Sequence, residues 1–286
     1  VINSLLQRSE AADGSRMIML ETVREFAQEQ LDKSGDAESA RQAHAVYFSR
    51  FMEEMDPLLW SSASSSLLNS VALEHDNLRA AMEWALAHDP ALALGMAQRV
   101  GAFWQKRTLW NEGRAWLKRV LDAAPATPST DRAIGLWRAG ALAADQGDFA
   151  EGVSLMNEAL VMAESLGDVP ITARVLRGLG IVASNQSDFA RANKLFTTAL
   201  EHFQATKDDA GIARVLNDLG LVAERQGDHV RAIELQEESL PIARRVGGTS
   251  SRPPHVTRPC EGFSRPIATR SSVLLPEPFG QKHTAA

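Results

Sequence analysis

The sequence predicts an all-α fold built from stacked helical repeats, and two observations support this prediction. The first is repetition, because "DQGDFAEGVS" (145–154), "NQSDFARANK" (185–194) and "RQGDHVRAIE" (225–234) are similar in sequence and lie forty residues apart. The second is the spacing of apolar residues between these stretches, which is typical of amphipathic helices. A fixed period of this size indicates supersecondary units that bury their apolar faces only by stacking on one another.

Each copy of the repeat predicts two helices joined by a short polar turn. Aligned at Ala133, Ala173 and Ala213, the copies share Gly, Gln, Asp and Leu at four matching positions. These are Gly140, Gly180 and Gly220; Gln146, Gln186 and Gln226; Asp148, Asp188 and Asp228; and Leu160, Leu200 and Leu240. The Asp follows the turn, where an N-cap accepts hydrogen bonds from the free amides of the next helix, so we interpret it as a cap and not as a catalytic acid. The small residue in the first helix predicts a close helix–helix approach.

These residues resemble the tetratricopeptide repeat family. Its pattern of Leu-Gly, then Gln-Gly-Asp, then Ala-Leu is followed by "LGIVASNQSDFARANKLFTTAL" (179–200) and "LGLVAERQGDHVRAIELQEESL" (219–240). We predict repeats over about 94–132, 133–172, 173–212 and 213–246, the first of them weaker because Thr108 and Leu109 occupy its turn positions. The usual repeat has about 34 residues, so the longer period here implies longer helices or longer connections.

The first part of the chain has a different pattern. Residues 2–20 predict two short strands around a turn at Asp13–Gly14. Within 15–36, the apolar spacing from Met19 to Leu31 predicts an amphipathic helix that Gly35 can end, and 40–54 predicts another. Further along, we expect Asp76 to cap a helix that runs through Ala87. Arg79 and Glu83 on that helix are spaced for an i,i+4 ion pair.

Four stretches of this region resemble the C-terminal half of bacterial STAND-type regulatory ATPases: "MLETVREFAQEQL" (19–31), "RQAHAVYFSRF" (41–51), "LEHDNLRAAMEWAL" (73–86) and "FWQKRTLWNEGRAWLKRVL" (103–121). The resemblance implies that 1–33 is the end of a winged-helix domain, that 34–75 forms connecting helices, and that 76–246 is a tetratricopeptide sensor array. The chain contains no phosphate-binding Gly-x4-Gly-Lys-Ser/Thr loop, so ATP and other cofactors are not assigned to it.

Composition and motifs exclude several functional classes. A net charge of −6 over 286 residues argues against nucleic-acid contact by this chain. The single Cys260 excludes an internal disulfide, and no catalytic or metal-binding motif is present, so we expect neither catalysis nor a metal. The charge-free run 57–73 is rich in serine and is no membrane span, and no secretion leader opens the chain, so we expect a cytoplasmic protein.

The first helix of each pair is expected to line the concave side of the solenoid, where a ligand would bind. The residues expected on that surface are Trp137, Arg138, Arg174, Arg177, Asn185, Arg214, Asn217 and Arg225. Guanidinium groups suit carboxylate and phosphate, so we predict an acidic peptide segment of a protein partner, or a small anionic effector. The alternative is a solvated face with intrahelical pairs such as Arg225 with Glu224. Trp84, Trp104, Trp110 and Trp116 are expected in the core.

The repeat pattern stops at Gly247. Residues 247–286 hold half of the twelve prolines and carry five basic against two acidic residues, and we expect them to be disordered. They are either a natural basic tail or the product of a shifted reading frame, and in both cases we expect 229–246 to fray. The sequence thus predicts the sensor region of a cytoplasmic signalling ATPase or transcription regulator. The alternative is a stand-alone scaffold that joins two proteins.

Overall fold

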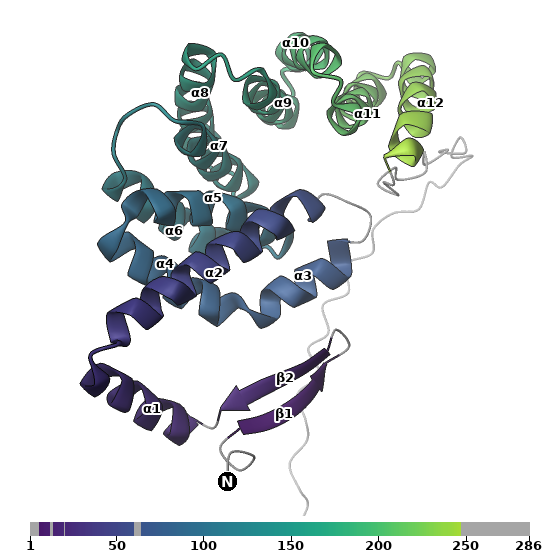
Figure 1. The fold of residues 1–286 in the computed structure, drawn as a ribbon. Helices are drawn as coiled ribbons and strands as arrows, with labels where there is room; N and C mark the ends of the chain where they lie inside the picture. The colour runs from purple at the N-terminus through teal and green to yellow at the C-terminus, as the bar shows by residue number, and fades with distance from the viewer. Residues whose placement is uncertain (1–5, 12–13, 20, 60–63, 247–286) are drawn as a thin grey trace, which may run out of the picture. The chain divides into compact units, whose positions relative to one another are not determined.

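The structure, a computed structural model, describes residues 6–11, 14–19, 21–59 and 64–246, and it confirms an all-α fold with tetratricopeptide-like repeats (Figure 1). The predicted hairpin is also present. Its strands β1 (Leu6–Ala11) and β2 (Gly14–Met19) pair antiparallel, with Leu6 opposite Met19 and Ala11 opposite Gly14. The predicted turn residue Asp13 lies outside the described residues, as does the whole of 247–286, for which the expectation of disorder stays a prediction.

Four helices precede the repeats: α1 (Glu21–Ser34), α2 (Ala37–Leu58), α3 (Ser64–Leu73) and α4 (His75–His88). The expected cap and ion pair of α4 are wrong. The helix begins one residue before Asp76, and no side chain accepts a hydrogen bond at its N-cap. Arg79 and Glu83 do not pair with each other, because α6 offers each of them a partner of opposite charge. Arg79 binds Glu112 at 2.7 Å and Glu83 binds Arg119 at 2.7 Å. These pairs join α4 to α6.

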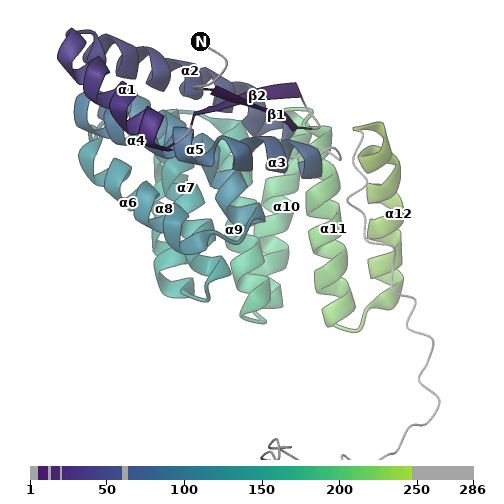
Figure 2. The same ribbon diagram turned by 90° about the horizontal axis from the view of Figure 1, so that it is seen from below.

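The repeats are four helix pairs: α5 (Pro90–Lys106) with α6 (Trp110–Ala123), α7 (Thr130–Asp145) with α8 (Phe149–Ser165), α9 (Val169–Asn185) with α10 (Phe189–Ala205), and α11 (Asp209–Arg225) with α12 (His229–Arg245). Successive helices lie side by side (Figure 2). From α9 to α12 every helix has 17 residues and three residues separate neighbouring helices, which accounts for the forty-residue period. Longer helices, and not longer connections, therefore explain the departure from the usual repeat length.

The five turns that connect α7 to α12 all have the same construction. A residue with positive φ ends one helix, and the Asp after it accepts a hydrogen bond from a backbone N–H in the first turn of the next. Asp148, Asp188 and Asp228 do this for α8, α10 and α12, as predicted. Asp168 and Asp208 do the same for α9 and α11, in the turns between pairs, and these two caps were not predicted. Every helix from α8 to α12 is thus capped by an aspartate.

Two of these turns place a residue other than glycine in the left-handed region. Ser187 has φ of 64° and Lys207 has φ of 55°, whereas Gly147 and Gly227 occupy the equivalent position elsewhere. Because only glycine adopts this conformation without a steric cost, Ser187→Gly and Lys207→Gly should each raise the free energy of unfolding by about 0.5–1 kcal/mol, as measured by urea denaturation. An unchanged midpoint in both variants would contradict this account of the turns.

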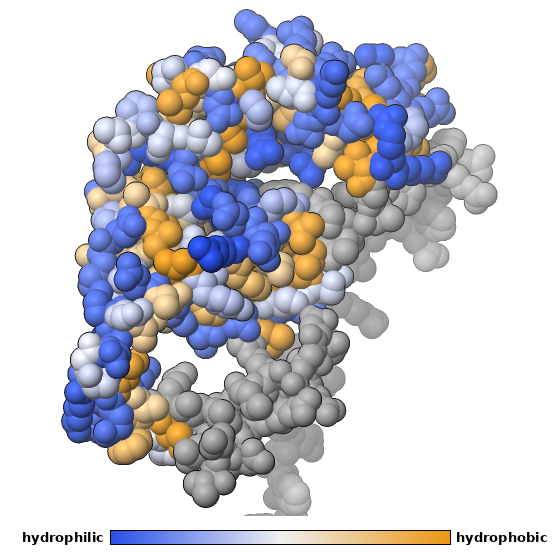
Figure 3. All heavy atoms as spheres, in the orientation of Figure 1, coloured by the Kyte–Doolittle hydropathy of each residue, from blue (hydrophilic) through white to orange (hydrophobic). Residues whose placement is uncertain are grey.

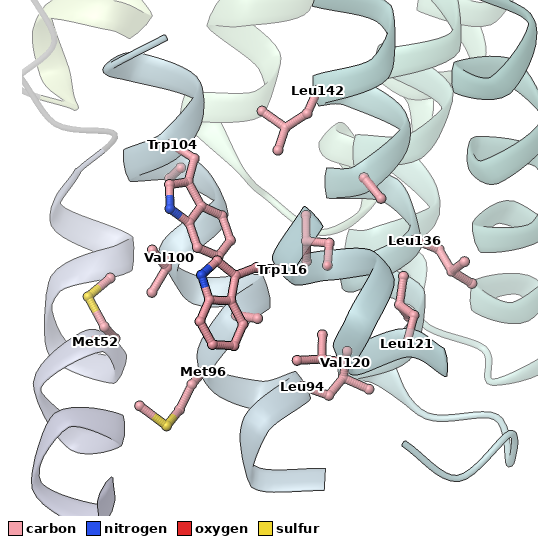
Figure 4. Packing of buried hydrophobic residues seen from close by; sticks show 14 of the residues in the cluster. Met52, Leu94, Met96, Val100, Trp104, Trp116, Val120, Leu121, Leu136 and Leu142 are labelled. Atoms are coloured by element: carbon pink, nitrogen blue, oxygen red, sulfur yellow. The ribbon is translucent and has the colours of Figure 1, made fainter. Parts of the chain in front are cut away.

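The core is formed by the apolar faces of the repeats and by α2. Trp104 is fully buried and Trp116 is 6% exposed, which confirms the expected packing role of these two residues. In Figure 4 their indoles lie next to each other, between Met52 of α2 and Val120 of α6. One buried cluster extends from α2 to α9, and a second continues through α9 to α11. No helix in the described ranges is long and apolar enough to cross a membrane.

Candidate functional site

The first helices of the repeats line the inner side of the solenoid. Helix α5 contacts α7, α7 contacts α9, and α9 contacts α11, so the first helices of successive pairs lie close to one another. The second helices α8, α10 and α12 lie outside this row (Figure 1). Crowding on the side of the first helices curves the row toward them, as expected for a solenoid. Ligand-binding residues on this side therefore come from α5, α7, α9 and α11.

Trp137 does not project from the inner surface as expected. It is half-buried at the contact between α7 and α9, where a Cβ built on Gly178 would lie 3.0 Å from the Trp137 Nε1 atom. The guanidinium of Arg138 lies 5.0 Å from the centre of the Trp137 ring. Gly178 of α9 thus leaves room for the indole, which packs between helices instead of facing a ligand.

Arg138 is not on the accessible inner surface as expected either, because only 4% of it is exposed. Its Nη2 atom donates to Asp56 Oδ1 over 2.9 Å, so the C-terminal turn of α2 covers this position. Burial lowers the pKa of Arg138 and the charge of Arg174 acts in the same direction, whereas the carboxylate of Asp56 raises it. Arg138 therefore holds α2 against α7 and is not accessible as predicted.

Three other predicted arginines do come together on the inner side. Arg174 is exposed on α9, Arg177 is half-buried one turn later, and Arg214 is half-buried on α11. Arg177 Nε donates to Asp218 Oδ2 over 2.6 Å. Burial lowers the pKa of Arg214, and the charges of Arg177 and Arg174 lower it further. Burial also raises the pKa of Asp218, against the opposing effect of Arg177 and Arg214. The structure thus places like charges near one another in a partly desolvated region.

Lys106, at the end of α5, belongs to the same group and was not predicted. Its ammonium donates to the carbonyl oxygen of Leu59. Burial lowers the pKa of Lys106, and the charge of Arg214 from α11 lowers it further, so the two side chains face the same region. The repeat register contained the signal, because Lys106 aligns with the predicted positions Asn185 and Arg225 once Gly101 is aligned with Gly140. We call Lys106, Arg174, Arg177 and Arg214 the inner cluster, and Arg138 is left out because it is buried.

The remaining predicted residues lie at the edge of this surface. Asn185 is exposed and Asn217 is half-buried. Arg225 is exposed, and its Nη1 atom donates to the carbonyl oxygen and the hydroxyl of Ser184, both over 3.2 Å. The suggested pairing of Arg225 with Glu224 is therefore not what the structure shows. Arg225 instead joins the end of α11 to α9.

The inner cluster carries more positive than negative charge. Arg177 forms an ion pair with Asp218 within it. Hydrophilic side chains line the hollow that separates the row of α9 and α11 from α2 (Figure 3). Arginine pairs with carboxylate or phosphate through two parallel hydrogen bonds, and partial burial reduces screening by solvent. In the described ranges no group of three or more His, Cys, Asp or Glu could hold a metal ion.

Comparison with known proteins supports the repeat fold. Residues 131–205 and 185–245 match the model of the tetratricopeptide repeat family. Among solved structures, aspartyl phosphate phosphatase F from Bacillus subtilis has a TM-score of 0.56 at 13% identity, covering 79% of this chain and 57% of that chain. BtubC from P. vanneervenii has a TM-score of 0.53 at 18% identity, covering 83% of this chain and 98% of that chain. At these identities the likeness shows the fold alone, a fold that typically serves as a binding scaffold.

A third structure is the Rap conjugation gene regulator of the plasmid pLS20 in complex with the Phr* peptide. Its TM-score is 0.50 at 11% identity, covering 70% of this chain and 64% of that chain. Curated relatives from Mycobacterium bovis and Mycobacterium tuberculosis, both named as candidate HTH-type transcriptional regulators, are 26% identical over 193 residues and 63% of this chain. The chain spans about a fifth of the length of these relatives, 21% in both cases.

Proposed function

We propose that this chain is the peptide-binding sensor region of an HTH-type transcriptional regulator, and that the inner cluster recognises an acidic segment of its partner. The observation that supports this most directly is the position of the basic residues on the repeats. Basic residues from α5, α9 and α11, the first helices of three of the four pairs, face one side of the solenoid, and Arg177 among them pairs with Asp218. A peptide that supplies further carboxylates would replace repulsion among these cations by bidentate pairing.

The regulator context rests on the relatives. They are named as HTH-type regulators, and this chain matches a fifth of their length, so we place it as one arm of a longer cytoplasmic protein. In that protein β1, β2 and α1 form the end of the winged-helix domain, with a STAND-type ATPase module before it. The plasmid regulator of similar fold was solved with a bound peptide, which supports a peptide as the ligand class.

The proposal predicts that Arg174→Ala with Arg214→Ala weakens binding of an acidic peptide. A charge-assisted hydrogen bond contributes about 1.5–3 kcal/mol, so removing two such donors should raise the Kd at least about tenfold. Fluorescence anisotropy with a fluorescein-labelled Glu-rich peptide measures this, and a Gln-rich peptide of equal length reports charge-independent binding. Arg177 is left in place, because its loss would strand the carboxylate of Asp218, whose side chain is 14% exposed.

The matched control is Arg191→Ala with Lys194→Ala. Both residues are exposed on α10, a second helix, so this variant loses the same charge on the other side of the solenoid. It should bind the Glu-rich peptide as the unaltered chain does. Equal weakening in the two double variants would mean that net charge, and not the inner cluster, attracts the peptide, and the proposal would then be wrong.

A further inference from the structure

One arginine from each first helix forms a row across the four repeats. The four are Arg99 on α5, Arg138 on α7, Arg174 on α9 and Arg214 on α11. Arg99 and Arg138 occupy the same position of the repeat when Gly101 is aligned with Gly140. Arg174 and Arg214 share a position four residues earlier, which is one turn earlier on the same helical face. The charge of Arg174 lowers the pKa of both Arg138 and Arg214, so these neighbours in the row lie close together.

Helix α2 already pairs with the first two arginines of this row. The Nη2 atom of Arg138 donates to Asp56 Oδ1 over 2.9 Å. The Nη2 atom of Arg99 lies 3.7 Å from Glu53 Oε1. Because Glu53 and Asp56 are three residues apart on α2, their side chains project from one face of that helix. The fold thus contains an acidic helix whose carboxylates at i and i+3 each pair with an arginine from a different repeat.

The other two arginines of the row offer a similar arrangement that α2 does not use. Arg174 is exposed and Arg214 is half-buried, and α2 contains no acidic residue after Asp56. Helices α9 and α11 are in contact, as α5 and α7 are, and packed helices have axes about 8–10 Å apart. Long side chains from two such helices can converge on the carboxylates of a third helix, whose i and i+3 positions are about 5–6 Å apart.

We propose that the acidic segment recognised by the inner cluster is an α-helix, two of whose carboxylates lie three residues apart and bridge Arg174 and Arg214. Glu53 and Asp56 of α2 make the same kind of bridge between α5 and α7. This inference rests on the proposed function, and it specifies the conformation of the partner segment and the spacing of its charges. The partner helix would continue the row along α9 and α11, beyond the part that α2 occupies.

Two fluorescein-labelled peptides of alanine, glutamine and four Glu, equal in length and composition, test this. The first has Glu at i, i+3, i+7 and i+10, on one face of a helix, and the second has Glu at i, i+2, i+7 and i+9, so that no two are three or four residues apart. Fluorescence anisotropy with the full chain should give a Kd at least about tenfold lower for the first peptide, because one helical turn of the second cannot reach both arginines. Circular dichroism should show that the first peptide gains helix when it binds.

Arg174→Ala and Arg214→Ala, made separately, should each abolish the preference for the first peptide, because one carboxylate of each bridge then has no partner. Arg174 is exposed, so its replacement should leave the melting temperature of the chain unchanged. Arg191→Ala is the matched control, since it removes one exposed charge from α10, a second helix, and it should keep the full tenfold preference.

Equal Kd values for the two peptides overturn this inference, and so does a preference that persists in both Arg174→Ala and Arg214→Ala. Tighter binding of the second peptide also overturns it and indicates an extended ligand, because residues at i and i+2 of a strand point to the same side. The proposed function survives these results as long as binding of the Glu-rich peptide depends on Arg174 and Arg214. If neither these peptides nor the Glu-rich peptide binds, the proposed function is wrong as well.

Discussion

Asp56→Ala is expected to lower the free energy of unfolding by about 3 kcal/mol, because it removes the carboxylate from a buried ion pair and leaves the guanidinium of Arg138 in place. The two groups are 2.9 Å apart, and their side chains are 5% and 21% exposed. Little solvent can therefore compensate for the lost carboxylate. Urea denaturation at neutral pH, with the slope checked for constancy, measures the loss.

The control for this prediction is an exposed pair. Glu83 and Arg119 are 2.7 Å apart with side chains 53% and 46% exposed, so Glu83→Ala should cost less than about 1 kcal/mol. Asp56→Ala combined with Arg138→Met should recover much of the loss, because the buried charge is then gone. If the two variants Asp56→Ala and Glu83→Ala lost similar free energies of unfolding, the folded chain would not depend on Asp56 to stabilise the buried charge of Arg138.

The same pair shows what the sequence could not predict. The repeat register placed Arg138 on a first helix, which is correct. It also placed Arg138 on the inner side of that helix, but α2 covers this position. Its burial depends on Asp56, eighty-two residues earlier in the chain and outside the repeats. A repeat pattern describes how each unit packs on its neighbours, and it contains no information on which other helix covers one of those units. Arg174, by contrast, is exposed, as the repeat register predicted.

Local features were predictable where one residue type has one physical role. An Asp after a helix-ending turn is a cap, and Asp148, Asp188 and Asp228 behave so. Asp168 and Asp208 have the same role but were not predicted, because Gly167 and Lys207 before them share no turn motif. The sequence also did not determine the length of the helices, because a repeat period of forty residues is compatible with longer helices and with longer connections. Only the structure decides between them.

Gly140→Ala and Gly220→Ala are expected to change stability in opposite directions, although the two glycines occupy the same position of the repeat. A Cβ built on Gly140 lies 2.8 Å from the carbonyl oxygen of Gly152, where α7 and α8 are in close contact. A backbone atom cannot move aside as a flexible side chain can, so the two helices must separate. Overpacking of this kind costs about 1–3 kcal/mol.

Gly220 has room for the same methyl group. The nearest atom to its added Cβ is Cγ of Gln236 at 3.4 Å, followed by the carbonyl oxygen of Ala232 at 3.5 Å, and both distances are ordinary contacts. Glycine inside a helix is less stable than alanine by about 0.5–1 kcal/mol, and Gly220→Ala should recover most of that difference. The glycine is thus required in α7 by the helix α8 beside it, and in α11 it is not.

Urea denaturation of the two variants in parallel tests this contrast, with amide exchange of α7 and α11 to locate each effect. Because neighbouring repeats stabilise one another, Gly140→Ala should speed exchange in α7 and α8 first, whereas Gly220→Ala should slow it in α11 and α12. Loss of stability in both variants would mean that close approach governs this position in every repeat. A gain in both would mean that α7 and α8 can separate without cost, and helix propensity alone would then determine stability at this position.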